Sequence, residues 1–595
     1  MKKYNNSLVK RLIFASFNLL IFASLTSCVD TVLLPDDKTV DEDFWKTKGE
    51  VSSMVYGAYK DMLSADIMNR LIVWGDFRSD EFLMSDGLNG AVPDDLEEIE
   101  GGAIETDNTF NAWGAFYTVI NDCNIVLKKA EGVMTLDPDY QPGDYQADRS
   151  QMLALRSLCY FYLVRAFRDV PYITEAYMNS SQEMNIPKIC PDTVMLGCIN
   201  DLEEAEKYAV QPDGYGDWRG QGLFTKLGIQ ALLADMYLWM ASVKDQSNPE
   251  LAATYYQKCV DYCDQIIDYK RNHVVLGPGE TLDKNDLYHL YPYNQYFNKI
   301  YFNDIGNEHE GIFELFFPGA GGNSAVNQMY RAGTGQSYLV IPECYGVSSG
   351  TYASYAESNY ESNVYGNYDT RLFNNVYEAN STTLDFYYTR KYVEIMDNGT
   401  LTAKKRNVTD GGSGSPTWII YRLADVMLMK AEALVQLTGN NNEDVRARQA
   451  FNIVQAVNLR ALYLDNQNDS LTWAKCEKLD LEKLVLAERA RELAFEGKRW
   501  FDMLRYNYRN VAVATDYSKT LNEMEDAKIP FAEHNDFFKS LLVRKYEGGA
   551  GAGVLAKMPT EPYLYMPMNQ DDIEVNPLLL QNPVYSANKQ WKKDV

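Results

Sequence analysis

The sequence predicts a mainly α-helical protein: an α-solenoid of paired helices interrupted by a loop-rich, tyrosine-rich insertion. Residues 110–269 carry apolar residues at helical spacing with only short breaks, and this spacing returns at 421–505. Between them, residues 270–415 lose the helical period and gain glycine, asparagine and tyrosine. Since a helix pair with one apolar face must bury that face on its neighbour, successive pairs indicate a repeat array.

The chain begins with the features of a secretory signal peptide. Basic residues precede a 14-residue apolar run at 12–25, which leads into Leu25-Thr26-Ser27-Cys28. A bilayer-spanning helix needs about 20 residues. The cysteine at the cut resembles a bacterial lipoprotein signal, in which the cysteine thiol is lipidated. We expect residues 1–27 to be removed, Cys28 to carry the lipid and 28–39 to be a flexible tether; a plain signal or a short membrane anchor is the alternative.

Composition argues against several classes of partner. The formal charge is −27, and loss of the four basic residues of the signal takes it to −31. Because phosphate contacts need clustered lysine and arginine, we expect no nucleic-acid partner and membrane contact through the lipid alone. Eight cysteines remain besides Cys28, which is sparse for an exported chain of this length. We expect mostly buried free thiols, and the sequence does not give any disulfide connectivity.

Residues 40–270 form the predicted N-terminal helical-repeat region. Its expected helices lie at 40–63, 110–133, 152–167, 192–210, 225–243 and 251–269, with a loop-rich stretch at 74–107. The helix at 152–167 is expected to end at Asp169-Val170-Pro171, since proline cannot continue a helix.

Residues 271–415 form the predicted insertion, with long loops and short strands. Insertions of this length are more often functional than mere linkers, so we expect it to be part of a binding face. Residues 416–595 return to helices, expected at 421–437, 444–462, 481–495 and from Trp500. Gly497 suits a helix C-terminus. The glycine run at 548–553 predicts a flexible loop.

No motif for catalysis or cofactor binding is complete. Gly346-Val347-Ser348-Ser349-Gly350 matches a nucleophile elbow, but a tyrosine-rich loop follows it where a helix is required. His309-Glu310 lacks the second histidine of a zinc protease, and the glycine run lacks the Lys-Ser/Thr of a phosphate loop. With 83 acidic residues, carboxylate pairs alone do not indicate a glycosidase. We expect no enzyme activity, no cofactor and no metal site.

Aromatic residues give the best indication of a ligand. The chain has 43 tyrosines, and aromatic clusters lie near Trp74, at 291–301 and at 345–368. Aromatic planes pack on the apolar faces of sugar rings while Asp, Asn and Arg bond the hydroxyls, a pattern typical of binding pockets. Packing within the loops is the alternative.

Several segments together resemble one known family. They are Trp74-Gly75-Asp76-Phe77-Arg78-Ser79-Asp80, the Trp113–Asn124 helix, Arg156–Tyr172, Gly222–Lys226, Asp369-Thr370-Arg371, Tyr421–Val426, Glu488–Asp502 and the Asn-Pro pairs of the tail. In order and across nearly the whole mature chain, these are similar to the SusD/RagB family of Bacteroidetes outer-membrane nutrient-binding lipoproteins. Arg168 stands where the family has glycine. Glu488, Arg489, Arg491 and Glu492 are expected to pair along and between helices, and so to mark the fold and not the ligand.

The resemblance implies a tetratricopeptide-like helical frame below a loop-rich binding face. It implies lipid anchoring on the outer leaflet of the outer membrane, a SusC-like TonB-dependent transporter as partner, and a glycan ligand. Family glycan contacts come from the loop after the first helix and from the middle insertion, which here gives Trp74, Asp76, Arg78, Asp80, Tyr293, Tyr296 and Tyr345. Peptide or other non-sugar binding, a transporter-docking protein without its own ligand pocket, and a glycosidase are the alternatives.

Overall fold

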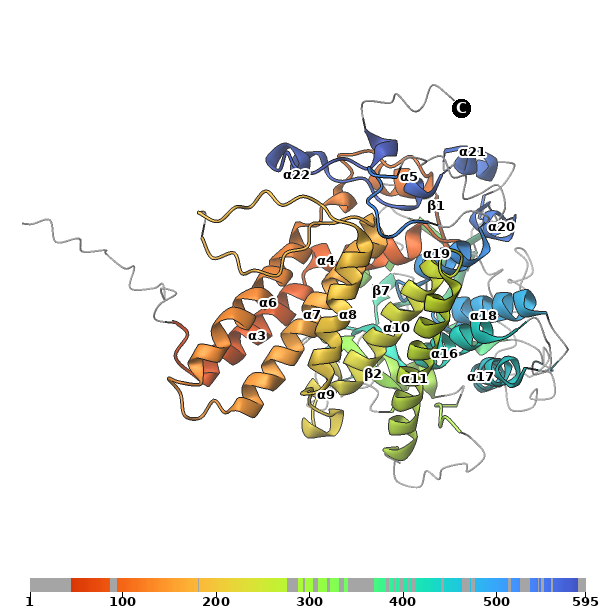
Figure 1. The fold of residues 1–595 in the computed structure, drawn as a ribbon. Helices are drawn as coiled ribbons and strands as arrows, with labels where there is room; N and C mark the ends of the chain where they lie inside the picture. Colours follow the sequence, from red (N-terminus) through yellow and green to blue (C-terminus); the bar gives the residue numbers. More distant parts are fainter. Residues whose placement is uncertain are drawn as a thin grey trace, which may run out of the picture.

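The computed structural model confirms a mainly helical protein (Figure 1). It describes residues 44–85, 94–179, 181–274, 287–292, 295–302, 309–317, 322–330, 337–340, 369–380, 385–389, 391–395, 401–404, 406–407, 413–439, 444–462, 471, 473, 477–511, 515–524, 536–543, 545–546, 550–557 and 560–586.

The N-terminal half of the helices comprises α3 (Lys48–Met62), α4 (Ala65–Ile72), α5 (Asp94–Glu100), α6 (Gly114–Val133), α7 (Pro142–Phe167), α8 (Pro191–Glu206), α9 (Arg219–Gly222), α10 (Lys226–Lys244) and α11 (Pro249–Asn272). Further along the chain are α12 (Tyr296–Tyr301), α13 (Ser324–Tyr330), α15 (Thr370–Asn375), α16 (Leu423–Leu437), α17 (Val445–Ala461), α18 (Lys478–Glu492), α19 (Arg499–Asn510), α20 (Asp536–Val543), α21 (Ala550–Lys557) and α22 (Gln570–Val575).

Sequential helices pack side by side, as the solenoid prediction requires. Helix α6 contacts α7, α7 contacts α8, and α10 contacts α11. The chain leaves this array after α11 and returns at α16, which packs on α11 and then on α17 and α18. Figure 1 shows these helices following one another across the molecule. The segment between α11 and α16 is therefore inserted between two neighbours in space.

The described strands are short and occur in antiparallel pairs. β2 (Gly311–Leu315) pairs with β10 (Trp418–Arg422), and β1 (Phe82–Ser85) pairs with β3 (Ser337–Val340). The remaining pairs are β4 (Val376–Asn380) with β5 (Asp385–Thr389), β6 (Val393–Ile395) with β7 (Leu401–Ala403), and β8 (Arg406–Asn407) with β9 (Ser413–Gly414). Whether 271–415 is a separate domain stays a prediction, as do the other domain boundaries.

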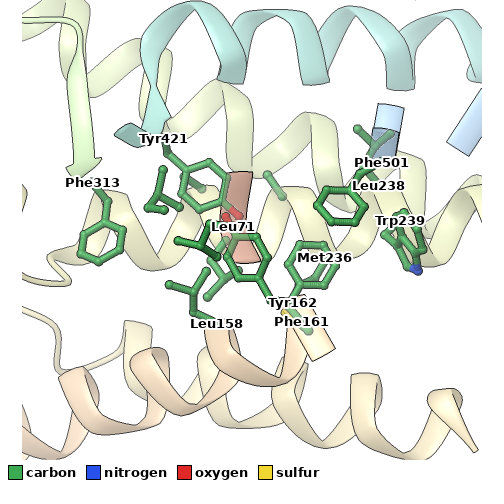
Figure 2. Packing of buried hydrophobic residues seen from close by; sticks show 14 of the residues in the cluster. Leu71, Leu158, Phe161, Tyr162, Met236, Leu238, Trp239, Phe313, Tyr421 and Phe501 are labelled. Atoms are coloured by element: carbon green, nitrogen blue, oxygen red, sulfur yellow. The ribbon is translucent and has the colours of Figure 1, made fainter. Parts of the chain in front are cut away.

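One continuous core joins the helices to the inserted strands. Figure 2 shows part of it, with side chains from α4, α7, α10, β2, β10 and α19 meeting: Leu71, Leu158, Phe161, Tyr162, Met236, Leu238, Trp239, Phe313, Tyr421 and Phe501. Helices α7 and α10 are central, since all residues of 150–167 and 227–243 are buried. Removal of this much apolar surface from water is the main source of stability.

Some predicted boundaries were wrong for local physical reasons. Helix α7 begins at Pro142, ten residues before the predicted start, because proline suits a first helical turn and Gln141 caps it with Asp144. The glycine run predicted as a loop lies partly in α21. A Cβ on Gly551 would lie 2.6 Å from Cβ of Val543, so this glycine lets α21 pack closely on α20.

Arg168, which follows α7, has a backbone conformation that favours glycine. Its φ is +67°. The fully buried guanidinium pairs with the Asp169 carboxylate at 2.8 Å and donates to the carbonyl oxygens of Lys519 and Asp516, each at 2.8 Å. These contacts to the C-terminal region offset the backbone strain.

Five of the six described cysteines act as core residues, and Cys190 is half-buried. Cys123, Cys159, Cys198, Cys259 and Cys263 are buried free thiols. Within the described ranges, no helix combines the length and the apolar character needed to cross a membrane.

Candidate functional site

Trp74 lies inside the core and not on a binding surface. Helix α4 continues into a π-helical turn, Val73–Phe77, which the sequence analysis treated as the start of a loop. The indole is 1% exposed, its Nε1 donates to the carbonyl oxygen of Phe110 at 3.1 Å, and its ring stacks on Phe116 at 5.1 Å between centroids. Its aromatic face is therefore used within the protein.

Asp76 joins the same turn to the C-terminal helices. Its carboxylate accepts hydrogen bonds from the backbone N–H groups of Gly497 (2.9 Å) and Lys498 (3.1 Å) and from the Tyr330 hydroxyl (3.3 Å). Burial raises the pKa of Asp76 to about 7, although the hydrogen bonds from Gly497 and Tyr330 act to lower it. The backbones approach so closely that a Cβ on Gly75 would lie 2.0 Å from the Gly497 carbonyl oxygen.

Arg78 and Asp80 also bind residues that are far away in the sequence. Arg78 donates to the carbonyl oxygens of Leu564 (2.6 Å) and Tyr563 (2.5 Å). Asp80 binds the Arg499 guanidinium through both oxygens, at 2.8 and 3.0 Å, and is fully buried. Ligand contact by the Trp74–Asp80 segment stays a prediction, and the burial of its side chains argues against it.

Of the tyrosines predicted as ligand contacts in the insertion, the structure describes Tyr296, which is also buried. Tyr296 is 3% exposed, accepts a hydrogen bond from Asn374 Nδ2 at 3.3 Å, and lies under the Arg460 guanidinium, 4.6 Å from its ring centroid. Its role as a ligand contact also stays a prediction. Tyr293, Tyr345 and Cys28 lie outside the described residues.

The Glu488–Asp502 motif supplies a buried ionic network, as the sequence analysis expected of a fold-marking segment. Glu492 accepts from Arg371 at 2.7 Å, from Arg422 at 2.6 Å and from Arg460. Glu496 binds Arg422, at 2.9 and 3.0 Å, and Lys391, at 2.6 Å. The network fixes the inserted residues 371 and 391 to α18 and the turn that follows it.

A solvent-accessible cavity lies elsewhere, where α9, the end of α11 and the start of β2 meet. Its volume is about 310 Å³. Figure 1 shows α9 near the end of α11, at the lower edge of the helical array. The lining residues are Pro212, Asp213, Gly216, Asp217, Gly220, Gln221, Leu227, Tyr269, Lys270, His273, Gly311 and Ile312.

Two stacked rings form one wall of this cavity. Tyr269, in the last turn of α11, and His273, which follows the helix, stack with centroids 4.0 Å apart and planes 11° apart, and His273 Nδ1 lies 2.9 Å from the Tyr269 carbonyl oxygen. Partial burial and the nearby Asp213 carboxylate raise the pKa of Tyr269 to about 12, so the hydroxyl keeps its proton at neutral pH. Lys270, also in the lining, donates to the Gly311 carbonyl oxygen at 2.5 Å.

This cavity can hold a small polar ring. It combines flat aromatic surface with a carboxylate, an amide and a phenolic hydroxyl, which are the groups that orient sugars. Its lining residues were not among those predicted from the sequence. A signal was present, since residues 212–222 form a glycine-rich loop that contains Tyr215 and Trp218 between two predicted helices.

Comparison with known families gives consistent matches along the chain. A model described as the SusD family matches residues 284–585, and one described as starch-binding associating with outer membrane matches residues 34–238. The chain is 27% identical over 519 residues to SusD-like protein P38 of Formosa agariphila, covering 85% of this chain and 92% of that protein. It is 25% identical over 521 residues to a SusD-like protein of Bacteroides ovatus, covering 81% and 82%.

Solved structures show the same fold. A SusD homolog of Bacteroides thetaiotaomicron aligns with a TM-score of 0.64 at 16% identity, covering 92% of this chain and 99% of the other. Surface glycan-binding protein A of Bacteroides uniformis aligns with a TM-score of 0.59 at 18% identity, covering 90% and 100%. The predicted family resemblance and fold class are confirmed, as is a binding protein in place of an enzyme. The chain belongs to the SusD family, an outer-membrane-associated family that includes surface glycan-binding proteins.

Proposed function

We propose that this chain captures oligosaccharides at the cell surface and passes them to a SusC-like TonB-dependent transporter. The observation that carries the proposal is the cavity beside α9, where Tyr269 and His273 lie next to Asp213 and Gln221. Membership of the SusD family supports a glycan as the ligand.

Binding in this cavity would need no chemical step. A pyranose ring can place its C–H face on an aromatic plane, while its hydroxyls exchange hydrogen bonds with Asp213, Gln221 and the Tyr269 hydroxyl. Each aromatic contact contributes about 0.5–1.5 kcal/mol by analogy with aromatic pairs. Several such weak contacts give an affinity that still permits rapid release to a transporter.

Calorimetric titration with a panel of neutral oligosaccharides tests the proposal. For a saccharide that binds, Tyr269→Ala is expected to raise Kd about threefold to tenfold. Tyr208→Ala is the matched control, because Tyr208 is 47% exposed and does not line the cavity. An unchanged Kd in Tyr269→Ala contradicts binding at this cavity.

The proposed location at the cell surface depends on lipidation of Cys28. Cys28→Ala is expected to leave a folded protein that binds the same saccharide but is no longer retained at the cell surface. Cell fractionation and surface labelling measure this. Continued retention of the variant at the surface of cells that lack the SusC-like transporter contradicts lipid anchoring.

The proposed partner can be tested in the same cells. A SusC-like transporter is expected to co-purify with the wild-type protein in mild detergent. Recovery of the transporter without this chain contradicts a stable complex.

A further inference from the structure

An exposed aromatic surface adjoins the cavity. We call it the aromatic rim and define it by Tyr56, Tyr215, Asp217, Trp218 and Arg219. Asp217 and Gly220 line the cavity, and Trp218 lies between them in the chain. Trp218 is 38% exposed and Tyr56 is 41% exposed. An exposed tryptophan presents a large, flat apolar face with which a ligand can make contact.

The Trp218 ring is held in place before any ligand arrives. It stacks on Phe316, with ring centroids 5.1 Å apart and planes 17° apart. Gly222 allows this position, since a Cβ there would lie 2.7 Å from the indole Cε3. A ring already fixed in one orientation loses little conformational entropy on binding.

Polar groups of the rim are oriented beside this ring. Arg219 donates to both oxygens of Asp217, from Nε and Nη2 at 2.9 Å each, and its guanidinium lies 5.3 Å from the Tyr215 ring centroid. Hydrogen bonding with Asp217 and then with Tyr56 raises the pKa of Arg219, so the guanidinium remains charged. Because Arg219 is paired with Asp217, the rim has no net charge and does not favour sulfated or uronic-acid chains.

We propose that the aromatic rim is a second saccharide subsite, continuous with the cavity, and that the ligand is a neutral glycan of at least two pyranose rings. One ring occupies the cavity against Tyr269 and His273, and a following ring stacks on Trp218. The Arg219–Asp217 pair then bonds hydroxyls of the second ring. This inference rests on the proposed function, because it extends the same site.

Dependence of affinity on chain length tests the inference. The probes are gluco-, xylo- and manno-oligosaccharides of one to six rings, titrated into the full mature chain by calorimetry. In the series that binds, wild-type affinity is expected to rise between one ring and two or three. Trp218→Ala is expected to lose this increase, so that its Kd for the longer ligands is about threefold to tenfold higher than that of the wild type. Binding of the one-ring ligand should not change.

Two further variants make the result specific. Trp218→Phe keeps an aromatic ring against Phe316 with a smaller exposed face, and an intermediate loss is expected. Tyr208→Ala should retain the full dependence on chain length. Thermal unfolding of each variant shows whether the fold is retained, and Trp218→Phe gives the test if Trp218→Ala does not fold.

The possible outcomes separate the two proposals. Affinity that does not depend on chain length, or longer ligands bound equally by wild type and Trp218→Ala or Trp218→Phe, overturns the rim as a subsite. In that case a weaker Kd in Tyr269→Ala still supports the cavity. If the wild-type chain binds none of the probes, the inference of a neutral glycan is overturned. If it also binds nothing on a glycan array, glycan capture itself is overturned.

Discussion

Asp80 distinguishes a structural role from a ligand-binding role. Its carboxylate makes two charge-assisted hydrogen bonds to Arg499, at 2.8 and 3.0 Å, in a site where Asp80 is fully buried and Arg499 is 3% exposed. Burial lowers the pKa of Arg499, but Asp80 outweighs this and raises it. Asp80→Asn removes the negative charge and leaves a buried guanidinium, since arginine does not release its proton.

The expected loss is large for one substitution. Breaking one side of a buried ion pair costs about 3–5 kcal/mol. The asparagine oxygen can still accept one hydrogen bond, and Arg499 keeps its bond to the Leu486 carbonyl oxygen at 3.0 Å. We therefore expect a loss near the lower limit, about 3 kcal/mol of unfolding free energy.

Urea denaturation followed by tryptophan fluorescence measures this loss. Glu204→Gln is the matched control, because Glu204 and Lys207 form an ion pair at 2.8 Å with side chains 38% and 63% exposed. Exposed pairs contribute about 0–1 kcal/mol, so the control should hardly change. A loss under about 1 kcal/mol in Asp80→Asn, together with weakened saccharide binding, would refute the structural role and favour the ligand role.

Substitutions at three other positions and a pH series test the rest of the interior. Burial raises the pKa of Glu496, but Arg422 and Lys391 outweigh this and lower it from 4.5 to about 2. Its stabilising contribution is thus complete above about pH 4.5 and lost as pH falls towards 2; urea midpoints across that range should fall, and less steeply in Glu496→Gln. Arg168→Gly should be more stable than Arg168→Ala by about 1 kcal/mol of unfolding free energy, because glycine adopts φ +67° without strain. A lower urea midpoint for Arg168→Gly would contradict this. Trp74→Ala should cost about 3–5 kcal/mol, measured by the same denaturation, and a stable variant with altered saccharide affinity would show that the ring faces a ligand.

Periodicity predicted the long helices, among them α10, which is buried along almost its whole length, and α11, which has one solvated face. Helix α11 alternates buried and exposed positions and was predicted to within three residues at each end. Helix α4 was missed because it is short and leads directly into a buried π-helical turn, so no polar boundary separates the two. Tyr421 and Arg422, the last two residues of β10, were predicted to begin a helix because a five-residue buried strand has no alternation that separates it from a helix start.

The site was harder to predict because one residue type serves two purposes. A tryptophan that stacks on sugar and one that stacks on Phe116 have the same side chain, and only the packed structure separates Trp74 from Trp218. The partners of Arg78 and Asp80 lie more than 400 positions away, so neither contact could be read from local sequence. Expected pairing within Glu488–Glu492 was partly visible, since Arg491 does bind Glu488 at 2.6 Å.

The location of the family motifs has a consequence for specificity. Segments 74–80 and 488–502 meet in the interior, where Asp76 accepts from Gly497 and Asp80 binds Arg499. Substitution there changes the stability of the whole protein, so such residues cannot vary freely with the nutrient. Trp218 and Arg219 differ, because Trp218 is exposed, Arg219 is half-buried, and Arg219 pairs with Asp217 in the same segment. Residues 74–80 and 488–502 therefore preserve the fold, whereas the proposed binding segment at 212–222 can change in composition without breaking this contact.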